Sequence, residues 1–255
     1  MRVMNQPLAA SPAPQASLAP ISVPAERIAG SVALLREAVQ RFGKVVYSSS
    51  LGAEAIVMMD LILGNDIAID VITVDTGRLF EQTRDLLERI ERRYGRRIRV
   101  MYPDAGNLQN YVARNGINAF YGSLELRQQC CHIRKVEPFG RAVRDYHAWV
   151  TGVRHEQSEA RAGTQPIEVD ERYKNMFKVS PLLAWTNREI WAHIREKKLP
   201  YNPLHDMGYP SIGCAPCTRA VEPGQDERSG RWWWESADSR ECGLQPRRPG
   251  TLSDL

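Results

Sequence analysis

Apolar runs and helix-forming segments alternate over the first half of this sequence, and the alternation limits the fold more than any other feature. Short apolar runs predict buried strands at residues 44–50, 67–77 and 96–103. Between them, residues 52–63 and 78–95 have the length and the apolar spacing that are typical of helices. Strands separated by helices at this spacing predict a parallel, doubly wound sheet with helices on both faces.

Further elements extend the pattern in both directions. Apolar residues at helical spacing predict a helix over residues 25–42, and Gly43 would end it. Residues 147–153 predict another core strand. Thr186 and Glu189 have the spacing of a capping box, so a late helix should begin there. The sequence contains no internal repeat, and we expect one α/β domain with a C-terminal half wrapped onto it.

The composition is that of an ordinary globular protein, and it excludes several classes. Of the 255 residues, 43% are hydrophobic and 25% are charged. No apolar run approaches the roughly 20 residues that span a bilayer. A net charge of +4 argues against a nucleic-acid groove and fits a local anion site better. Five cysteines are too few for a disulfide-stapled fold, and their odd number leaves one unpaired, so we expect a reducing, cytoplasmic location.

The chain divides by composition into three parts. Residues 1–24 are rich in Ala, Pro and Ser and lack acidic residues, which predicts a disordered tail without a targeting signal. Residues 25–235 hold the predicted α/β domain. Residues 236–255 form a C-terminal segment that carries the fifth cysteine, Cys242, and chain ends of this kind are typically mobile.

A serine-rich turn, YSSSLGAEA at residues 47–55, joins a predicted strand to the next helix. Its backbone N–H groups, with three hydroxyls and a glycine, would form an anion cradle at the helix N-terminus. The residues concerned are Ser48, Ser49, Ser50 and Gly52. The Gly-Lys-Ser/Thr ending of a nucleotide P-loop is missing, so a turn that binds no ligand is an equal alternative from this stretch alone.

A second polar turn, VDTGR at residues 74–78, follows the next predicted strand. The carboxyl ends of parallel strands meet at one edge of a sheet, where ligands bind. Asp75, Thr76 and Gly77 should therefore face the same crevice as the serine turn, which favours a ligand site there.

Four of the five cysteines form two close pairs. Cys130 and Cys131 are adjacent, while Cys214 and Cys217 form the CxxC motif CAPC. Two pairs can supply four sulfurs to a metal centre. Adjacent cysteines reach two corners of an iron–sulfur cube more easily than they reach one zinc ion, which favours a [4Fe–4S] cluster over zinc, buried free thiols or a redox-active CxxC. In a helix, Lys135 would lie one turn beyond Cys131 and could bring positive charge between the cluster and a substrate, the alternative being a solvated lysine.

Two arginine-rich segments complete the candidate site. Residues 151–163 carry Arg154 and Arg161, and a glycine-containing segment further on carries Arg228 and Arg231. Arginine binds phosphate and sulfate bidentately, in a way that lysine does not copy. Single arginines are usually solvated charge, but four on a chain with an anion turn indicate an oxyanion site.

Together these motifs resemble the assimilatory adenylyl-sulfate (APS) reductases, the iron–sulfur branch of the family that also holds the phosphoadenylyl-sulfate (PAPS) reductases. The matching stretches run in the family's order over roughly residues 25–245. They are SSSLGAEA, VDTGRLFEQT, QQCCHIRK, GVRHEQSEAR, SPLLAWTNREIW, YNPLHDMGYPSIGCAPCTR, GQDERSGRWWWE and ECGL. The cysteine pairs and the late ECG are the most specific of them.

The resemblance implies a Rossmann-like α/β fold of the adenine-nucleotide α-hydrolase type. It implies reduction of APS to sulfite and AMP in sulfate assimilation and cysteine biosynthesis, with reduced thioredoxin or a glutaredoxin-like protein as the electron donor. It further implies one [4Fe–4S] cluster per subunit on the four paired cysteines, and Cys242 as the nucleophile that carries an S-sulfocysteine intermediate. The nucleotide would be lined by Ser48, Ser49, Ser50, Gly52, Asp75, Thr76 and Gly77, and the phosphosulfate by Lys135, Arg154, Arg161, Arg228 and Arg231.

Two positions depart from the family's pattern. Ala55 stands where an Asp usually follows Glu54, and Gln245 stands where a His usually closes the tail motif. Three other functions remain as alternatives: a PAPS reductase, an adenylating or thiolating enzyme of the ATP-pyrophosphatase type, and a zinc-binding module without activity. The sequence indicates no oligomeric state.

Overall fold

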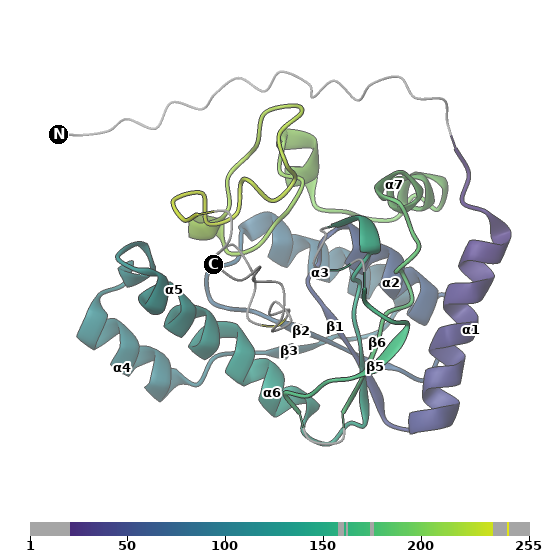
Figure 1. Ribbon diagram of the computed structural model, residues 1–255, viewed down its shortest axis with the longest axis horizontal. Helices are drawn as coiled ribbons and strands as arrows, with labels where there is room; N and C mark the ends of the chain where they lie inside the picture. The colour runs from purple at the N-terminus through teal and green to yellow at the C-terminus, as the bar shows by residue number, and fades with distance from the viewer. Residues whose placement is uncertain (1–20, 158–160, 162, 174–175, 237–243, 245–255) are drawn as a thin grey trace, which may run out of the picture.

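Six strands form one sheet at the centre of the described chain, in the order β3-β2-β1-β4-β6-β5 (Figure 1). The computed structural model describes residues 21–157, 161, 163–173, 176–236 and 244. The strands are β1 (Val45–Ser49), β2 (Asp70–Val74), β3 (Arg99–Met101), β4 (Ala148–Val150), β5 (Ile167–Val169) and β6 (Phe177–Val179). All neighbours pair in parallel except β5, which runs antiparallel to β6. The predicted parallel sheet is confirmed, with one antiparallel strand at its edge.

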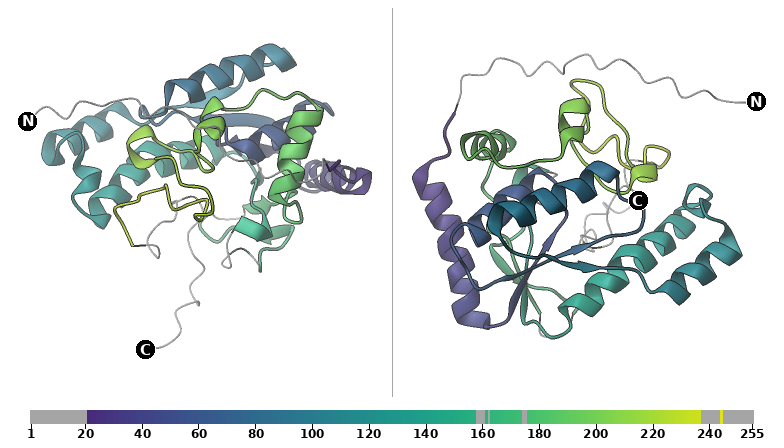
Figure 2. Two further views of the ribbon diagram at one scale, coloured as in Figure 1. Left: turned by 90° about the horizontal axis from the view of Figure 1, so that it is seen from above. Right: turned by 180° about the vertical axis from the view of Figure 1, so that it is seen from behind.

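Helices cover both faces of this sheet (Figures 1 and 2). The α-helices are α1 (Ala25–Phe42), α2 (Ala53–Leu63), α3 (Glu81–Tyr94), α4 (Ala105–Asn115), α5 (Leu124–Cys131), α6 (Glu137–Val143) and α7 (Asn187–Glu196). Short 3₁₀ turns are η1 (Ala119–Tyr121), η3 (His155–Gln157), η5 (Pro203–Met207) and η6 (Ala215–Cys217), and η2 (His132–Val136) is a π-helix turn. In the part of the chain that the structure describes, no helix is both long enough and apolar enough to cross a membrane.

The ends of two helices follow directly from the sequence. Helix α1 covers the predicted residues and ends at Gly43, whose φ of 72° is one that glycine adopts without strain. At the start of α7, the Thr186 side chain accepts from the Glu189 N–H, and the Glu189 carboxylate accepts from the Thr186 N–H at 2.7 Å. Both predicted boundaries are confirmed.

Successive side chains of β1 pack into two hydrophobic cores on opposite faces of the sheet. Val45 and Tyr47 belong to the larger core, which also holds side chains of α1, α2, α3 and α7. Val46 belongs to a second core together with Ile72 of β2 and Phe139 of α6. Because side chains of a strand point alternately to opposite faces, a strand covered on both sides is apolar over most of its buried length. In β1, Val45, Val46 and Tyr47 fill the two cores, and the buried Ser49 at the carboxyl end is polar.

A third hydrophobic cluster joins the C-terminal half to the helices beside the sheet. It contains Tyr111 of α4, Phe120, Cys130 of α5, Cys217 and Trp232. In Figure 1, α4 and α5 lie next to each other, and the light-green to yellow segment after α7 lies above them. The two cysteine pairs are therefore brought together by a core of their own.

A buried polar contact joins α2 to α3 and α7. Asp60 Oδ1 accepts from the Tyr94 hydroxyl at 2.8 Å, and Asp60 Oδ2 lies 2.7 Å from His193 Nε2. Burial opposes ionisation of Asp60, but the hydrogen bonds from His193 and Tyr94 and the charges of His193 and Lys197 outweigh it and hold the pKa of Asp60 below its ordinary value. The contact anchors α2, whose N-terminus reaches the candidate site.

Candidate functional site

The serine turn, both cysteine pairs and four of the predicted basic residues line one cavity of about 290 Å³. The predicted residues in its wall are Ser48, Ser49, Ser50, Gly52, Thr76, Cys130, Cys131, Cys214, Cys217, Lys135, Arg161, Arg228 and Arg231. Asp75 and Gly77 flank Thr76 without lining the cavity, and Arg154 lies outside the lining set. Cys242 and Gln245 lie outside the described residues.

The serine turn is shaped by its own hydroxyl groups. Ser49 Oγ accepts from the Leu51 N–H at 3.2 Å, and Ser50 Oγ accepts from the Gly52 N–H at 3.4 Å. Leu51 is 2% exposed and has a φ of 60°, a left-handed conformation that costs a non-glycine residue roughly 1–2 kcal/mol. The turn leads directly into α2, whose N-cap residue is Gly52 and therefore has no side chain to cap the first N–H groups of that helix. Such groups are suited to bind an anion.

The second polar turn links the serine turn's side of the cavity to the cysteines. Asp75 Oδ1 accepts from the Gly77 N–H at 2.8 Å, which closes the turn. Thr76 Oγ1 lies 3.2 Å from Cys214 Sγ, and Arg134 Nη1 donates to the Thr76 carbonyl at 2.7 Å. Thr76 therefore contacts one cysteine through its side chain and, through its carbonyl, the buried arginine that follows the other cysteine pair.

The thiols of Cys130, Cys131, Cys214 and Cys217 are close enough to affect one another's ionisation. Burial raises the pKa of Cys217, and the neighbouring Cys214, Cys131 and Cys130 raise it further. Burial also raises the pKa of Cys130, while the charge of Arg134 opposes the change. Among the described residues, no group of three or more His, Cys, Asp or Glu side chains is arranged to hold a metal ion. A single metal ion needs its ligands to converge on one point, whereas an iron–sulfur cube binds each thiolate at a separate corner.

Helix α5 ends at Cys131 and continues directly into the π-helix turn η2. In a π turn, residues five positions apart lie close on one face, and such turns are frequent at functional sites. Cys130 and Lys135 are five positions apart, and both line the cavity. Lys135 does lie in a helical segment, the condition on which its placement near the cysteines depended, and the local helix is of the π type.

The CxxC motif lies on the short turn η6. The Cys217 N–H donates to the Cys214 carbonyl at 2.9 Å, and the Trp232 N–H donates to the Cys217 carbonyl at 3.1 Å. The segment of residues 230–235, called the tryptophan segment below, lies close to the chain after the CxxC motif. A Cβ added to Gly230 would lie 2.3 Å from the Arg219 carbonyl oxygen. A residue without a side chain is therefore needed at position 230 to hold this segment against the CxxC loop.

A buried ion pair ties the end of the tryptophan segment to the cysteine helix. Arg127 Nε and Nη2 donate to the two carboxylate oxygens of Glu235 at 2.9 and 2.7 Å, and the two side chains are only 2% and 7% exposed. The guanidinium carbon also lies 4.8 Å from the centre of the Trp232 ring. Arg127 precedes Cys131 by one turn of α5, so the pair fixes this helix at the cavity. Sequence reasoning missed it, because its members are far apart in the chain.

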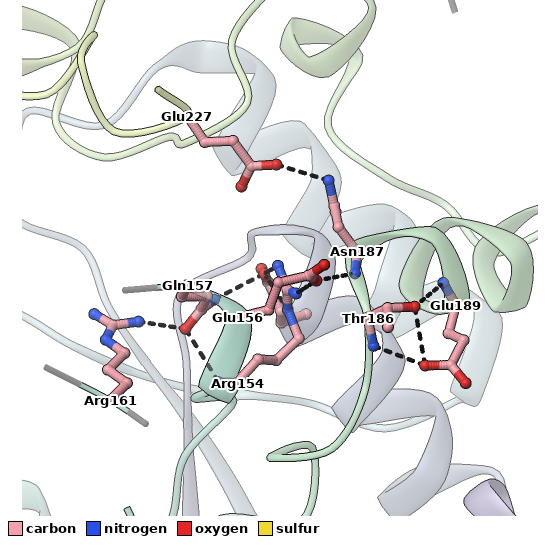
Figure 3. A network of polar contacts seen from close by, with 9 residues as sticks. Arg154, Glu156, Gln157, Arg161, Thr186, Asn187, Glu189 and Glu227 are labelled. Atoms are coloured by element: carbon pink, nitrogen blue, oxygen red, sulfur yellow. Dashed lines mark hydrogen bonds and ion pairs between the residues drawn. The ribbon is translucent and has the colours of Figure 1, made fainter. Parts of the chain in front are cut away.

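Arg154 belongs to the network of carboxylates and amides in Figure 3. It does not line the cavity itself, but Glu54 and Gln157 of this network do. It is 1% exposed, and its guanidinium donates to Glu54 Oε1 at 2.9 and 3.0 Å and to Glu156 Oε2 at 2.8 Å. The Gln157 amide donates to the same Glu54 oxygen at 2.9 Å, and Arg161 Nη1 donates to Gln157 Oε1. Of the two arginines predicted in this segment, Arg161 lines the cavity, whereas Arg154 does not line it and binds Glu54, which does.

Leu244 adds a wall to the cavity that sequence reasoning did not predict. It is buried in the second core beside Trp149, and both residues line the cavity. Arg172 Nη1 donates to the Leu244 carbonyl at 2.7 Å, and the same guanidinium is held by Asp170. The contact holds Leu244, a residue of the ECGL motif, in the cavity wall.

Comparison with known proteins gives this arrangement a family. A family model described as the phosphoadenosine phosphosulfate reductase domain matches residues 44–220, which is more than half of the chain. The chain belongs to the phosphoadenosine phosphosulfate reductase family. The resemblance predicted from the motifs is confirmed, and the matched range includes the serine turn and both cysteine pairs.

Relatives within the phosphoadenosine phosphosulfate reductase family match most of the chain. The adenosine 5'-phosphosulfate reductase of Burkholderia cepacia is 49% identical over 83% of this chain and 84% of its own. The protein of the same name from Allochromatium vinosum is 45% identical over 92% of this chain and 93% of its own. The crystal structure of a phosphoadenylyl-sulfate reductase from Candida auris covers 79% of this chain and 99% of its own, with a TM-score of 0.64 and 28% identity.

Proposed function

We propose that this chain reduces APS to sulfite and AMP in sulfate assimilation. The observation that carries the proposal is the single cavity in which the serine turn, both cysteine pairs and Arg161, Arg228 and Arg231 meet. Two relatives that match most of the chain, at 49% and 45% identity, are named adenosine 5'-phosphosulfate reductases and support the same substrate.

The two sides of the cavity suit the two parts of APS. The serine turn and the uncapped N–H groups of α2 suit the adenylyl end, because helix N-termini attract phosphate. Lys135 and the arginines suit the phosphosulfate, since guanidinium groups bind such oxyanions through paired hydrogen bonds. In this scheme Arg154 acts indirectly, by holding Glu54 and, through it, Gln157 in the cavity wall, where Gln157 binds Arg161.

The donor set fits a [4Fe–4S] cluster, one per subunit. Cys130, Cys131, Cys214 and Cys217 would hold it, because their thiols lie in one wall of the cavity and influence one another's pKa. A bound cluster would supply an electrostatic environment for the substrate sulfate. Lys135 lines the same cavity and would add a positive charge between this wall and the sulfate.

Cys242 is the proposed nucleophile. Its thiolate attacks the sulfur of APS, an S–S bond forms, the S–O bond to AMP breaks, and AMP leaves with the electron pair. The arginines and the N–H groups of α2 would stabilise the charge that develops on the leaving phosphate. One thiolate of reduced thioredoxin then attacks Cys242 Sγ, and sulfite leaves with the S–S electron pair. The second thioredoxin thiol resolves the mixed disulfide, so the two electrons come from the dithiol.

Sulfite release from APS by the anaerobically purified protein with reduced thioredoxin tests this scheme. Cys242→Ser should abolish turnover and leave the iron content and visible absorbance unchanged. Cys214→Ser is the matched variant, and it should lose the absorbance. Turnover that persists in Cys242→Ser would show that another group is the nucleophile.

PAPS is the second candidate substrate, because the family model and the Candida auris structure carry that name. Kinetics with APS and PAPS side by side distinguish the two. An adenylating enzyme would instead consume ATP without releasing sulfite. A zinc module would contain one zinc ion per chain and no iron, whereas the proposed cluster contains about four irons per chain.

A further inference from the structure

Two segments that are far apart in the chain carry the arginines of the cavity. Arg161 follows the short turn η3, while Arg228 and Arg231 lie in the loop between the CxxC motif and Trp232. None of these three arginines belongs to a described strand of the sheet or to a described α-helix. Their positions must therefore come from contacts with more rigid parts of the fold.

Asn187 contacts both segments, as Figure 3 shows. Its backbone N–H donates to Glu156 Oε2 at 2.7 Å, and the same oxygen accepts from the buried Arg154. Its side-chain amide donates to Glu227 Oε1, also at 2.7 Å, and Glu227 is the immediate neighbour of Arg228. One residue thus holds a carboxylate from each arginine segment.

Asn187 is held in place by the helix that it begins. Asn187 is the first residue of α7, directly after the capping box of Thr186 and Glu189. Helix α7 is buried against the core through Ile190 and Ile194. The N-terminus of a helix also favours nearby negative charge, so two carboxylates are well placed there.

We propose that Asn187 is a positioning residue, which sets the distance between the two arginine segments and thereby the oxyanion-binding side of the cavity. The inference rests on the proposed function, since the oxyanion concerned is the phosphosulfate of APS. Asn187 does not line the cavity, so its effect on the substrate is indirect and acts through Glu227 with Arg228, and through Glu156 with Arg154.

Two substitutions at this position separate the contacts. Asn187→Ala removes the amide that binds Glu227 and keeps the backbone N–H that binds Glu156. Asn187→Pro removes both donors, and proline suits the first position of a helix, where the extended Thr186 (φ −86°, ψ 159°) is compatible with a following proline. We expect Asn187→Ala to raise the KM for APS about fivefold, within the range for one lost hydrogen bond. Asn187→Pro should raise it further, and kcat should change less than KM in both.

Glu227 supplies the complementary variants. Glu227→Ala should raise KM as Asn187→Ala does, and the double variant should be no worse than either single one, because both remove the same bond. Glu227→Gln keeps an acceptor oxygen for the Asn187 amide, so it should raise the KM for APS much less than Glu227→Ala does. A purely structural role of Asn187 would lower the melting temperature without this pattern in KM.

Glu196→Ala, at the exposed far end of α7, is the matched control. If Asn187→Ala and Asn187→Pro both leave KM within about twofold of this control, or if the effects of the Asn187 and Glu227 alanine variants multiply in the double variant, the inference is wrong. The wild-type assay reports separately on the function: no sulfite from APS would refute the proposed activity, whereas normal sulfite release with an unchanged KM in the variants would refute only the role of Asn187.

Discussion

Replacing Glu235 by alanine should strongly destabilise the protein, because it leaves the guanidinium of Arg127 buried without its carboxylate. The two side chains are 2% and 7% exposed and share two hydrogen bonds, so solvent screens the pair little. Removing one partner of a buried ion pair typically costs about 3–5 kcal/mol. The contacts of Arg127 with the Trp232 ring and with Cys131 remain and offset part of this loss. We therefore expect a loss near the lower end of the range, about 3 kcal/mol. For a domain of this size, that corresponds to a fall in melting temperature of about 6–12 °C.

Scanning calorimetry of the anaerobic holoprotein measures the effect. Glu88→Ala breaks an ion pair with Arg92 that is exposed to solvent, and this control should change the stability by less than about 1 kcal/mol. The double variant Arg127→Met with Glu235→Leu removes both charges and should recover most of the lost stability. If Glu235→Ala melts within the range of the Glu88 control, the buried pair does not stabilise the contact between α5 and the tryptophan segment.

Other contacts predict different effects. The pKa of Asp60 is depressed, so its ionised form stabilises the fold above the ordinary carboxyl pKa. This stabilisation is lost as the pH falls through the depressed pKa. The free energy of unfolding, measured in urea at several pH values, should therefore fall less steeply in acid for Asp60→Asn than for the wild type. Gly230→Ala forces a Cβ to within 2.3 Å of the Arg219 carbonyl oxygen, which should cost about 1–3 kcal/mol in urea unfolding and raise the KM for APS. Asp104→Ala removes the side-chain cap of α4 and should cost about 1 kcal/mol by the same unfolding assay, without changing KM.

Local signals in the sequence predicted the parts of the fold that depend on neighbouring residues. The end of α1 at Gly43 and the capping box of α7 need only residues within one helical turn. The strands β5 (IEV) and β6 (FKV) escaped prediction, because a charged residue at the centre of each interrupts the apolar run, and because their pairing joins segments that the local sequence does not relate. The antiparallel edge of the sheet consequently could not be anticipated.

The candidate site shows the same division. Cysteine spacing predicted which sulfurs would meet, since residue type and spacing are local properties, and the structure brings them to one cavity. The partners of charged residues were not predictable: Arg127 finds Glu235, and Arg154 finds Glu54, only after the chain has folded. The local sequence around an arginine does not show whether the side chain will face a ligand or a buried carboxylate. Arg154 and Arg161 therefore could not be distinguished from the sequence.

Thr76 gives this architecture an evolutionary consequence. Its hydroxyl contacts Cys214, its carbonyl accepts from the Arg134 that follows the other cysteine pair, and the residue itself lines the cavity. A lineage that lost the cysteines would therefore leave polar groups of this turn without their neighbours. Positions 76 and 134 should accordingly covary with the cysteine pairs among relatives, so that this turn and the proposed cluster residues are inherited as one unit.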